Sequence, residues 1–410
     1  MSAFWHPFAD MHVVQDSPFI IDRAEGVHVF DEDGNPYLDA AAGLWYANIG
    51  YGRQEVIEAV HRQMNQLPAF HCFIDYATRP PIELAERIAA VSPDPGSKVF
   101  FGLGGSDAID TAAKLSRRYF AAIGQPERTV FIAREWAYHG MNTYGTSLGG
   151  MEPNRFGYGE LVGDVVFVPY DDAEAVEKAI DHAGPERIAG IFVEPVVGAG
   201  GVRPVPESYL KRVREAVRAA GGLYISDEVI TGFGRAGDWF AAKRFDLQPD
   251  MITFAKGVTC GYLPLGGVVV ASHIAAPFFD QAGNIFRHGY TYSGHAASCA
   301  AGLAVMDIIE NEGILQRAME LEAEIPAALA PLTDFDFVTE IRAGVGALAA
   351  IQLQTGDDTL ASRAAISCRQ AGVLTRAVGG GGLQVSPPLV MTPEQVDEMA
   401  ERFHTGLAAL

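Results

Sequence analysis

The sequence is poor in cysteine and in positive charge. Its 410 residues include only 4 cysteines, at positions 72, 260, 299 and 368, and no two of them have Cys-x-x-Cys spacing. This scarcity argues against a disulfide framework and a zinc site, and it is typical of a reducing cytoplasm. Lysine and arginine number 30 against 51 acidic residues, which gives a net charge of −21 without any basic block. Because such a surface repels phosphate backbones, we do not expect nucleic-acid binding.

Long apolar runs are also missing. No uninterrupted apolar stretch approaches the roughly 18 residues that a membrane-spanning helix needs. The N-terminal segment MSAFWHPFADMHVV lacks the basic and apolar parts of a signal peptide. We therefore expect a cytoplasmic protein that does not contact membranes. The composition is that of a globular protein, with 49% apolar and 20% charged residues, and the length favours one large domain with a smaller one.

From about residue 98 onward, strand patterns alternate with helical patterns. The expected strands are Lys98–Phe101, Thr129–Ile132, Val165–Val168, Ala189–Val193, Leu223–Ser226, Met251–Phe254 and Gly267–Ala271. This alternation predicts an α/β fold with a mostly parallel seven-stranded sheet and helices on both faces. After about residue 295 the pattern changes to that of a smaller α+β domain. The expected division is 1–50 as an N-terminal arm and part of the small domain, 51–295 as the large domain, and 296–410 as the C-terminal small domain.

The stretch from Leu223 to Lys256 carries the strongest functional signal. One predicted strand ends at Asp227 and the next at Ala255-Lys256. Ligands of open α/β sheets bind beyond the carboxyl ends of the strands, so this carboxylate and this lysine would face one site. Pyridoxal phosphate needs such a pair, because a lysine holds it as a Schiff base and an acidic partner keeps its ring nitrogen protonated. The pair alone is equally compatible with a structural carboxylate and a solvated lysine.

Three further strands lead into residues that could complete a site. They are followed by the segment from Gly102 to Ser106, by Tyr138-His139-Gly140, and by Glu194-Pro195. Five such strand ends on one edge of a sheet predict an active site there. Gly105 and Ser106, at the start of a helix, would offer N–H groups and a hydroxyl to a phosphate group, although serine is also an ordinary helix cap.

The interval between Asp227 and Lys256, with Asp-Glu-Val and then Gly-Phe-Gly-Arg, resembles that of the class III (omega) aminotransferases of the type I pyridoxal-phosphate fold. The segment 287–295, RHGYTYSGH, resembles a second element of that family. The resemblance extends from His6 to Pro388. Two small departures are Asp107, where many relatives have glutamate, and Ala296, where many have proline.

The resemblance implies pyridoxal 5'-phosphate as the cofactor, with Lys256 and Asp227 as the catalytic residues. It implies that Thr291 of the partner subunit reaches the cofactor phosphate, so a homodimer with shared active sites is expected, and a tetramer stays open. Tyr138 would stack on the cofactor ring and Val229 would cover its other face. The expected cofactor-binding residues are Gly105, Ser106, Tyr138, His139, Glu194, Asp227, Val229, Lys256 and Thr291.

The expected substrate-binding residues are Trp45, Tyr138 and Arg376. In the family, an arginine at the place of Arg376 binds the substrate carboxylate as a bidentate fork. The adjoining glycine run 379–382 would let it swing away for substrates without a carboxylate. Ile230 replaces a glutamine that is common in ornithine- and 4-aminobutyrate-type relatives, which favours the group that uses pyruvate.

The expected reaction is therefore transfer of an amino group from an omega-amino acid or primary amine to a keto-acid acceptor, pyruvate, by a ping-pong mechanism. Two enzymatic alternatives stay open. One is an amino-acid racemase or aminomutase of the same fold, and the other is a diamine or diaminopelargonate-type aminotransferase. A non-catalytic binding protein on this fold is the remaining alternative, and the presence of both Lys256 and Asp227 argues against it.

Overall fold

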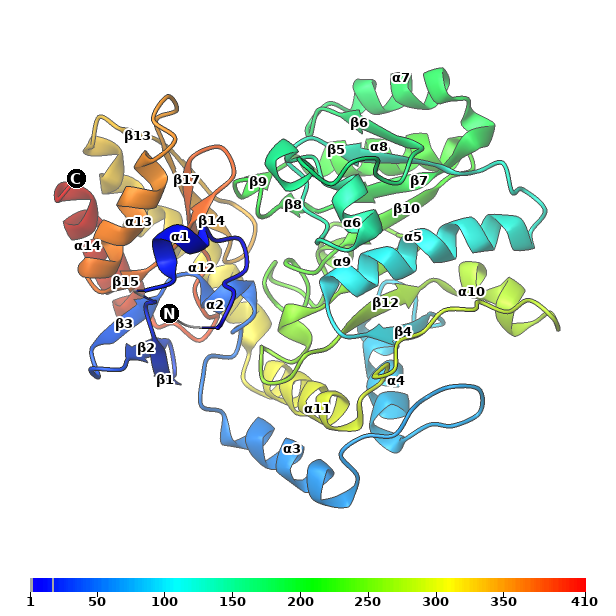
Figure 1. Cartoon of the computed structure of the whole chain (residues 1–410), viewed down its shortest axis with the longest axis horizontal. Helices are drawn as coiled ribbons and strands as arrows, with labels where there is room; N and C mark the ends of the chain where they lie inside the picture. Colours follow the sequence, from blue (N-terminus) through cyan, green and yellow to red (C-terminus); the bar gives the residue numbers. More distant parts are fainter. Residues whose placement is uncertain (1–2, 17) are drawn as a thin grey trace.

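The computed structural model describes residues 3–16 and 18–410, which form two lobes (Figure 1). The larger lobe is built around the central sheet. The smaller lobe contains both ends of the chain, with the N-terminal strands (blue) beside the C-terminal helices (orange and red). Among the described residues, no helix is long and apolar enough to cross a membrane.

The central sheet has seven strands in the order β4-β12-β11-β10-β7-β5-β6. Only β12 runs antiparallel to its neighbours. The strands are β4 Lys98–Gly102, β5 Val130–Arg134, β6 Val165–Val168, β7 Ile188–Val193, β10 Leu223–Asp227, β11 Met251–Phe254 and β12 Gly266–Val270. Each lies within one or two residues of a strand predicted from the sequence, so the mostly parallel seven-stranded sheet is confirmed.

Helices cover both faces of this sheet. The strands β7 and β10 are buried at every position, as expected for strands with a helix layer on each side. On one face, apolar residues of α5 and α10 pack on the strands, and on the other face those of α7 and α8 do so. These helices are α5 Gly105–Ala122, α7 Ala173–Ala183, α8 Glu207–Ala219 and α10 Ser272–Phe279.

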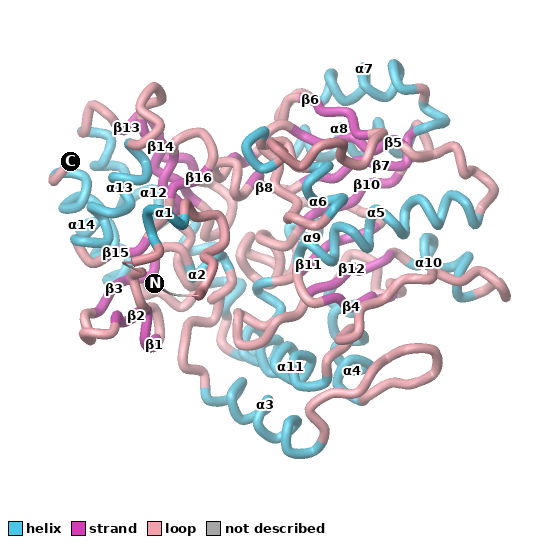
Figure 2. The backbone as a smooth tube through the Cα atoms, in the orientation of Figure 1, coloured by secondary structure: helices cyan, strands magenta, loops and turns pink. Residues whose placement is uncertain are grey.

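A second group of helices lies at one end of the sheet. There α11 (Ala296–Asn311) packs against α3 (Gln54–Gln66) and α4 (Arg79–Val91) (Figure 2). The remaining short elements of this lobe are α6 Thr143–Leu148, α9 Ala241–Arg244, β8 Val196–Val197, β9 Arg203–Pro204, and the 3-10 turns Glu152–Asn154, Pro185–Arg187 and Lys256–Val258.

The smaller lobe contains two four-stranded sheets, β1-β2-β3-β15 and β13-β14-β17-β16. Strands β2 and β3 form an antiparallel hairpin. Parallel pairing of β3 with β15 joins the N-terminal segment to the C-terminal part of the chain. The expected division into domains stays a prediction. Strand β13, which has polar exposed positions, was not predicted.

The elements of the smaller lobe have the following bounds. The strands are β1 Ile21–Glu25, β2 His28–Asp31, β3 Pro36–Asp39, β13 Val338–Arg342, β14 Ala349–Leu353, β15 Val373–Leu374, β16 Ala377–Val378 and β17 Gly382–Val385. The helices are α1 Met11–Val14, α2 Ala42–Trp45, α12 Ile314–Leu329, α13 Leu360–Gln370 and α14 Pro393–Ala408, with a 3-10 turn at Ala330–Asp334. Helix α14 begins with a capping box formed by Thr392 and Gln395.

Candidate active site

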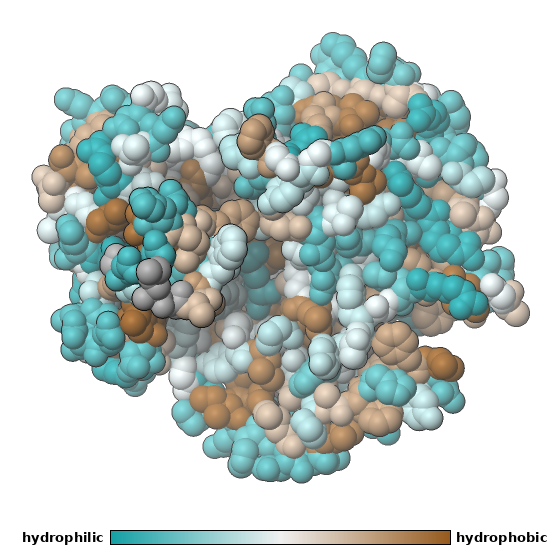
Figure 3. All heavy atoms as spheres, in the orientation of Figure 1, coloured by the Kyte–Doolittle hydropathy of each residue, from teal (hydrophilic) through white to brown (hydrophobic). Residues whose placement is uncertain are grey.

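The carboxyl ends of β4, β5, β7, β10 and β11 meet at one edge of the sheet, because these strands run parallel. Residues that follow these ends line a cavity of about 350 Å³. The molecular surface is hollowed between the two lobes (Figure 3). The predicted site residues that line the cavity are Gly105, Ser106, Tyr138, His139, Glu194, Asp227, Val229 and Lys256.

Lys256 contributes a partly buried amine at the end of β11. Burial lowers its pKa from 10.5 to about 8, and the nearby carboxylates of Asp227 and Glu194 offset part of this effect. The backbone at Lys256 has φ +47°, a region that side-chain-bearing residues adopt rarely. Among the described residues, Nζ has no hydrogen-bond or ion-pair partner. The amine is therefore largely available as a base or nucleophile slightly above neutral pH.

Asp227 is fixed by three donors. Its Oδ1 accepts hydrogen bonds from Thr253 Oγ1 at 2.9 Å and from the Val229 N–H at 3.1 Å. Its Oδ2 accepts one from His139 Nδ1 at 2.7 Å. Since a carboxylate offers about four acceptor positions, one position is left for a group in the cavity. Thr253 holds this carboxylate because it is paired with Asp227 across β10 and β11.

The N-terminus of α5 forms another wall. Gly104, its N-cap, provides no side-chain hydrogen bond, and the first N–H groups of a helix have no partner within it. A Cβ atom on Gly105 would lie 2.9 Å from Val229 Cγ1, so glycine keeps this wall open. Ser106 Oγ accepts a hydrogen bond from the Met141 N–H at 3.1 Å. Together with the helix dipole, these groups suit an anion.

Glu194 lies deep in the same cavity and is 4% exposed. Its two oxygens accept hydrogen bonds from the N–H groups of Tyr138 at 3.0 Å and Gly198 at 2.8 Å. Burial raises the pKa of Glu194. The carboxyl group therefore shapes the loop that carries Tyr138.

Most of the remaining lining is apolar, and sequence reasoning missed it. These residues include Leu44, Tyr46, Leu103, Ile109, Leu263, Pro264 and Leu265. Apolar side chains like these are common in any protein core, so the sequence does not distinguish them as lining residues. Thr253 was also missed. Its place opposite Asp227 on the next strand was the one available signal for it.

Trp45 and Arg376 adjoin the cavity but do not line it. The Trp45 side chain is 2% exposed. The centroid of one of its rings lies 4.5 Å from Arg376 Cζ and 5.9 Å from Lys256 Nζ, so both cations lie within cation–π range of the same indole. Thr291 is exposed and lies outside the cavity of its own chain. The substrate roles of Trp45 and Arg376, and the phosphate role of Thr291, stay predictions.

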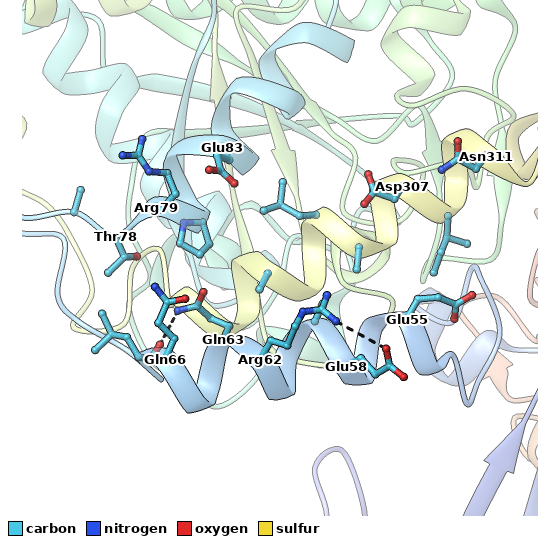
Figure 4. Close-up of a pocket in the computed structure, with 18 of the residues that line it drawn as sticks. Glu55, Glu58, Arg62, Gln63, Gln66, Thr78, Arg79, Glu83, Asp307 and Asn311 are labelled. Carbon is cyan, nitrogen blue, oxygen red and sulfur yellow. Dashed lines mark hydrogen bonds and ion pairs between the residues drawn. The ribbon is translucent and has the colours of Figure 1, made fainter.

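A larger groove of about 860 Å³ lies between α3, α4 and α11 (Figure 4). None of the predicted site residues lines it. Of its charged groups, Arg62 forms an ion pair with Glu58 at 3.8 Å, and Glu55 and Glu312 pair with Arg53, which lies outside the lining. No lysine, histidine or cysteine is among the described residues that line this groove, so it has no counterpart of the Lys256 amine. Nowhere in the described part of the chain do three potential metal ligands cluster.

The cavity at Lys256 fits pyridoxal phosphate. The unbonded N–H groups at the start of α5 suit its phosphate, and the free acceptor position of Asp227 suits a protonated ring nitrogen. The unpaired amine of Lys256 suits its aldehyde carbon. His139 Nε2 is buried without a partner in the described structure, so His139 has a further position for hydrogen bonding.

Comparisons with known proteins agree with this geometry. The family model described as "Aminotransferase class-III" matches residues 11–407. The chain is 38% identical to putrescine–pyruvate aminotransferase from Pseudomonas aeruginosa over 96% of this chain and 91% of that protein. It is 36% identical to beta-alanine–pyruvate aminotransferase from the same organism, over 99% and 96%. The crystal structure of a PLP-bound amine transaminase from an uncultivated Pseudomonas species superposes with a TM-score of 0.96 at 34% identity, covering 100% of this chain and 99% of that one.

Proposed function

The chain belongs to the class-III aminotransferases, which use pyridoxal phosphate, and we propose that it transfers the amino group of an omega-amino acid or primary amine to pyruvate. The observation that carries this proposal is the pairing of two cations over one indole. Lys256 supplies an unpaired amine and Arg376 supplies a guanidinium without a carboxylate partner among the described residues. The acceptor is supported by two relatives whose names include pyruvate.

Lys256 and the residues around it have separate roles in the proposed reaction. Pyridoxal phosphate, when bound here, would supply the carbonyl group that accepts the amino group of the donor and the electron sink for the carbon that carries it. Lys256 takes the proton from that carbon, and its lowered pKa suits it to act as a base. Asp227 holds a positive ring nitrogen with its free acceptor position. His139 orients Asp227 by its 2.7 Å hydrogen bond.

Arg376 receives the carboxylate of pyruvate in this proposal. A guanidinium can donate two parallel hydrogen bonds to a carboxylate, and both Nη atoms of Arg376 are free of partners within the described residues. The donor leaves as a ketone or aldehyde before pyruvate enters, and pyruvate leaves as alanine. This order is a ping-pong mechanism.

On the donor side, the apolar lining supports an amine with an apolar substituent. The two carboxylates that line the cavity, Glu194 and Asp227, already accept hydrogen bonds from the protein. They therefore leave little acceptor capacity for the second ammonium group of a diamine. We propose that a monoamine such as 1-phenylethylamine reacts faster than putrescine.

The test is a panel of donors, 1-phenylethylamine, beta-alanine and putrescine, each combined with pyruvate or 2-oxoglutarate. We expect alanine and the matching carbonyl product with pyruvate, and much less glutamate with 2-oxoglutarate. Absence of alanine with every donor would refute the proposed reaction. Racemisation of alanine without any acceptor would instead identify a racemase.

We further propose a homodimer in the cytoplasm. Apolar side chains that are exposed in the single chain support a paired surface, among them Ile74 at 100% and Tyr292 at 58%. Phe73, Ile74 and Ile285 line a surface hollow of about 1030 Å³ near the segment that carries Thr291. Such a patch is unusual on a monomer. The four free cysteines are consistent with a reducing compartment.

A further inference from the structure

We propose that Gln384 is a positioning residue for Arg376, which it holds in the orientation that receives the carboxylate of the acceptor. The inference rests on the proposed function, in which Arg376 is the carboxylate-binding group. It adds a residue that sets the balance between substrates with and without a carboxylate.

The two side chains face each other because of strand register. Strands β16 and β17 are antiparallel, with Ala377 opposite Leu383 and Val378 opposite Gly382. One step further along the ladder, the Gln384 N–H donates to the Arg376 carbonyl at 3.0 Å. Residues directly opposite on antiparallel strands have their side chains on the same face. Gln384 is therefore placed to reach Arg376 by the hairpin itself.

The Gln384 side chain is buried and uses both ends of its amide. Its Oε1 accepts a hydrogen bond from Arg376 Nε at 3.0 Å, and its Nε2 donates to the Ala41 carbonyl at 3.1 Å. A backbone carbonyl can only accept and a guanidinium can only donate. The two contacts therefore allow only one orientation of the amide, with its oxygen toward Arg376.

The Trp45 indole, which Ser386 holds in place just after β17, supports one face of the guanidinium. Ser386, two residues beyond Gln384, accepts a hydrogen bond from Trp45 Nε1 at 3.1 Å. The guanidinium of Arg376 lies over that indole at 4.5 Å. Gln384 thus fixes the Nε edge of the guanidinium, and Trp45 fixes its plane. The two Nη groups are left for a ligand.

The glycine run beside Arg376 is not a free hinge. The Gly379 N–H donates to the Ala199 carbonyl at 2.9 Å. The Gly380 carbonyl accepts from Gln352 Nε2 at 2.7 Å, and the Gly381 carbonyl from the Leu353 N–H at 3.2 Å. Because the backbone is fastened at these points, Arg376 moves chiefly by rotation of its side chain.

There is room for that rotation. Arg376 lines a separate hollow of about 460 Å³, together with Asp39 and Tyr46. Burial lowers the pKa of Arg376, so its present position is costly for the charge unless a ligand pairs with it. The bond to Gln384 is the one hydrogen bond that its side chain makes to the described residues. Breaking that bond would release the guanidinium from the orientation in which it receives the carboxylate of pyruvate.

The test compares Gln384→Leu with wild type, both as holoenzymes. Leucine fills similar space but removes both amide contacts. The first measurement is the dissociation constant of propanoate, by calorimetry, since this carboxylate has no amino or keto group and cannot react. The second is the single-turnover rate of each half-reaction, with pyruvate and with 1-phenylethylamine, followed by cofactor absorbance.

We expect the dissociation constant of propanoate and the half-saturating pyruvate concentration to rise about tenfold, as for loss of one hydrogen bond to a charged group. The half-reaction with 1-phenylethylamine should change by less than about twofold, because it leaves Arg376 unused. The matched control is Gln352→Leu. It removes another buried amide of the same sheet, one that holds Gly380 but does not touch Arg376. Because the contacts of Gly379 and Gly381 still fasten the glycine run, this control should leave all three quantities unchanged.

A double-mutant cycle with Arg376→Leu completes the design. In that background Gln384→Leu should have no further effect on propanoate binding. Unchanged propanoate binding in a Gln384→Leu protein with wild-type thermal stability would overturn the inference, and so would an equal loss in Gln352→Leu. Gln384→Met serves as a second variant if the leucine variant unfolds. If Arg376→Leu weakens propanoate binding but Gln384→Leu does not, the inference fails while the proposed function stands. If Arg376→Leu also has no effect, the role of Arg376 fails with it.

Discussion

Replacing Lys256 with methionine should stabilise the cofactor-free protein at neutral pH, although it removes the base of the proposed reaction. Burial beside the cavity lowers the pKa of Lys256 from 10.5 to about 8. The folded state therefore disfavours the ammonium form, whereas the unfolded chain does not. Methionine has a similar length and no charge, so it avoids this cost.

The expected gain in the free energy of unfolding follows from the pKa of Lys256 in the folded and unfolded states. A folded-state pKa of about 8 against 10.5 in the unfolded chain corresponds to about 3 kcal/mol at pH 7. Part of the Lys256 side chain faces the cavity, where water screens its charge. We therefore expect the variant to be more stable by about 1 to 3 kcal/mol at pH 7.

The sign of the pH dependence is fixed by proton binding. Between pH 8 and pH 10.5 the unfolded chain binds more protons at Lys256 than the folded protein does. The stability of the wild type thus rises with pH through this window relative to the variant. At about pH 9.5 the difference between the two should be roughly half of that at pH 7.

Urea unfolding of the two apoproteins, at equal protein concentration and at both pH values, measures this difference. Lys243→Met, at an exposed lysine, is the control and should show no such dependence. A Lys256→Met protein that is less stable than wild type at pH 7 would refute the reasoning. A stabilisation that is the same at both pH values would refute it as well, because packing and not charge would then be its cause.

Three further predictions concern the proposed function. Asp227→Asn should lower the single-turnover rate by at least about a hundredfold, because a neutral amide no longer favours a protonated ring nitrogen; wild-type rates would leave Asp227 a structural role. Arg376→Ala should slow the half-reaction with pyruvate by about a hundredfold through loss of a charge-assisted contact, with little effect on that with 1-phenylethylamine; equal losses in both would contradict it. Lys256→Ala and Thr291→Arg, each inactive alone, should partly restore activity when mixed, because each heterodimer has one intact site; absence of rescue despite subunit exchange would place Thr291 in the site of its own subunit.

The sequence was informative where one local pattern decides the structure. The central strands are apolar along their whole length because both faces of the sheet are covered, so their positions could be predicted. The parallel direction of these strands then placed Asp227, Lys256 and the residues near them at one edge. That step needs only the order of strands and helices, which explains why eight predicted residues line one cavity.

The sequence was less informative where irregular backbone decides which side chain faces the cavity. Ala42 and Trp45 both have positive φ, at +47° and +63°. This path turns Leu44 and Tyr46 toward the cavity and buries Trp45 behind them. No periodicity encodes such a turn. The contact between Arg376 and Gln384 depends in the same way on the register of a short hairpin, which a sequence pattern does not define.

The distance between Lys256 and Arg376 depends on how the two lobes are joined. Lys256 belongs to the larger lobe and Arg376 to the smaller one, and Trp45 lies between them. Arg235 fastens the lobes nearby, since its guanidinium donates to the carbonyl of Pro387 at 2.5 Å and to Asn48 Oδ1 at 2.6 Å. Burial lowers the pKa of Arg235 to about 10, so it keeps its charge at neutral pH. In the proposed function, these fixed contacts of Arg235 leave the side chain of Arg376 as the part that adjusts to each substrate.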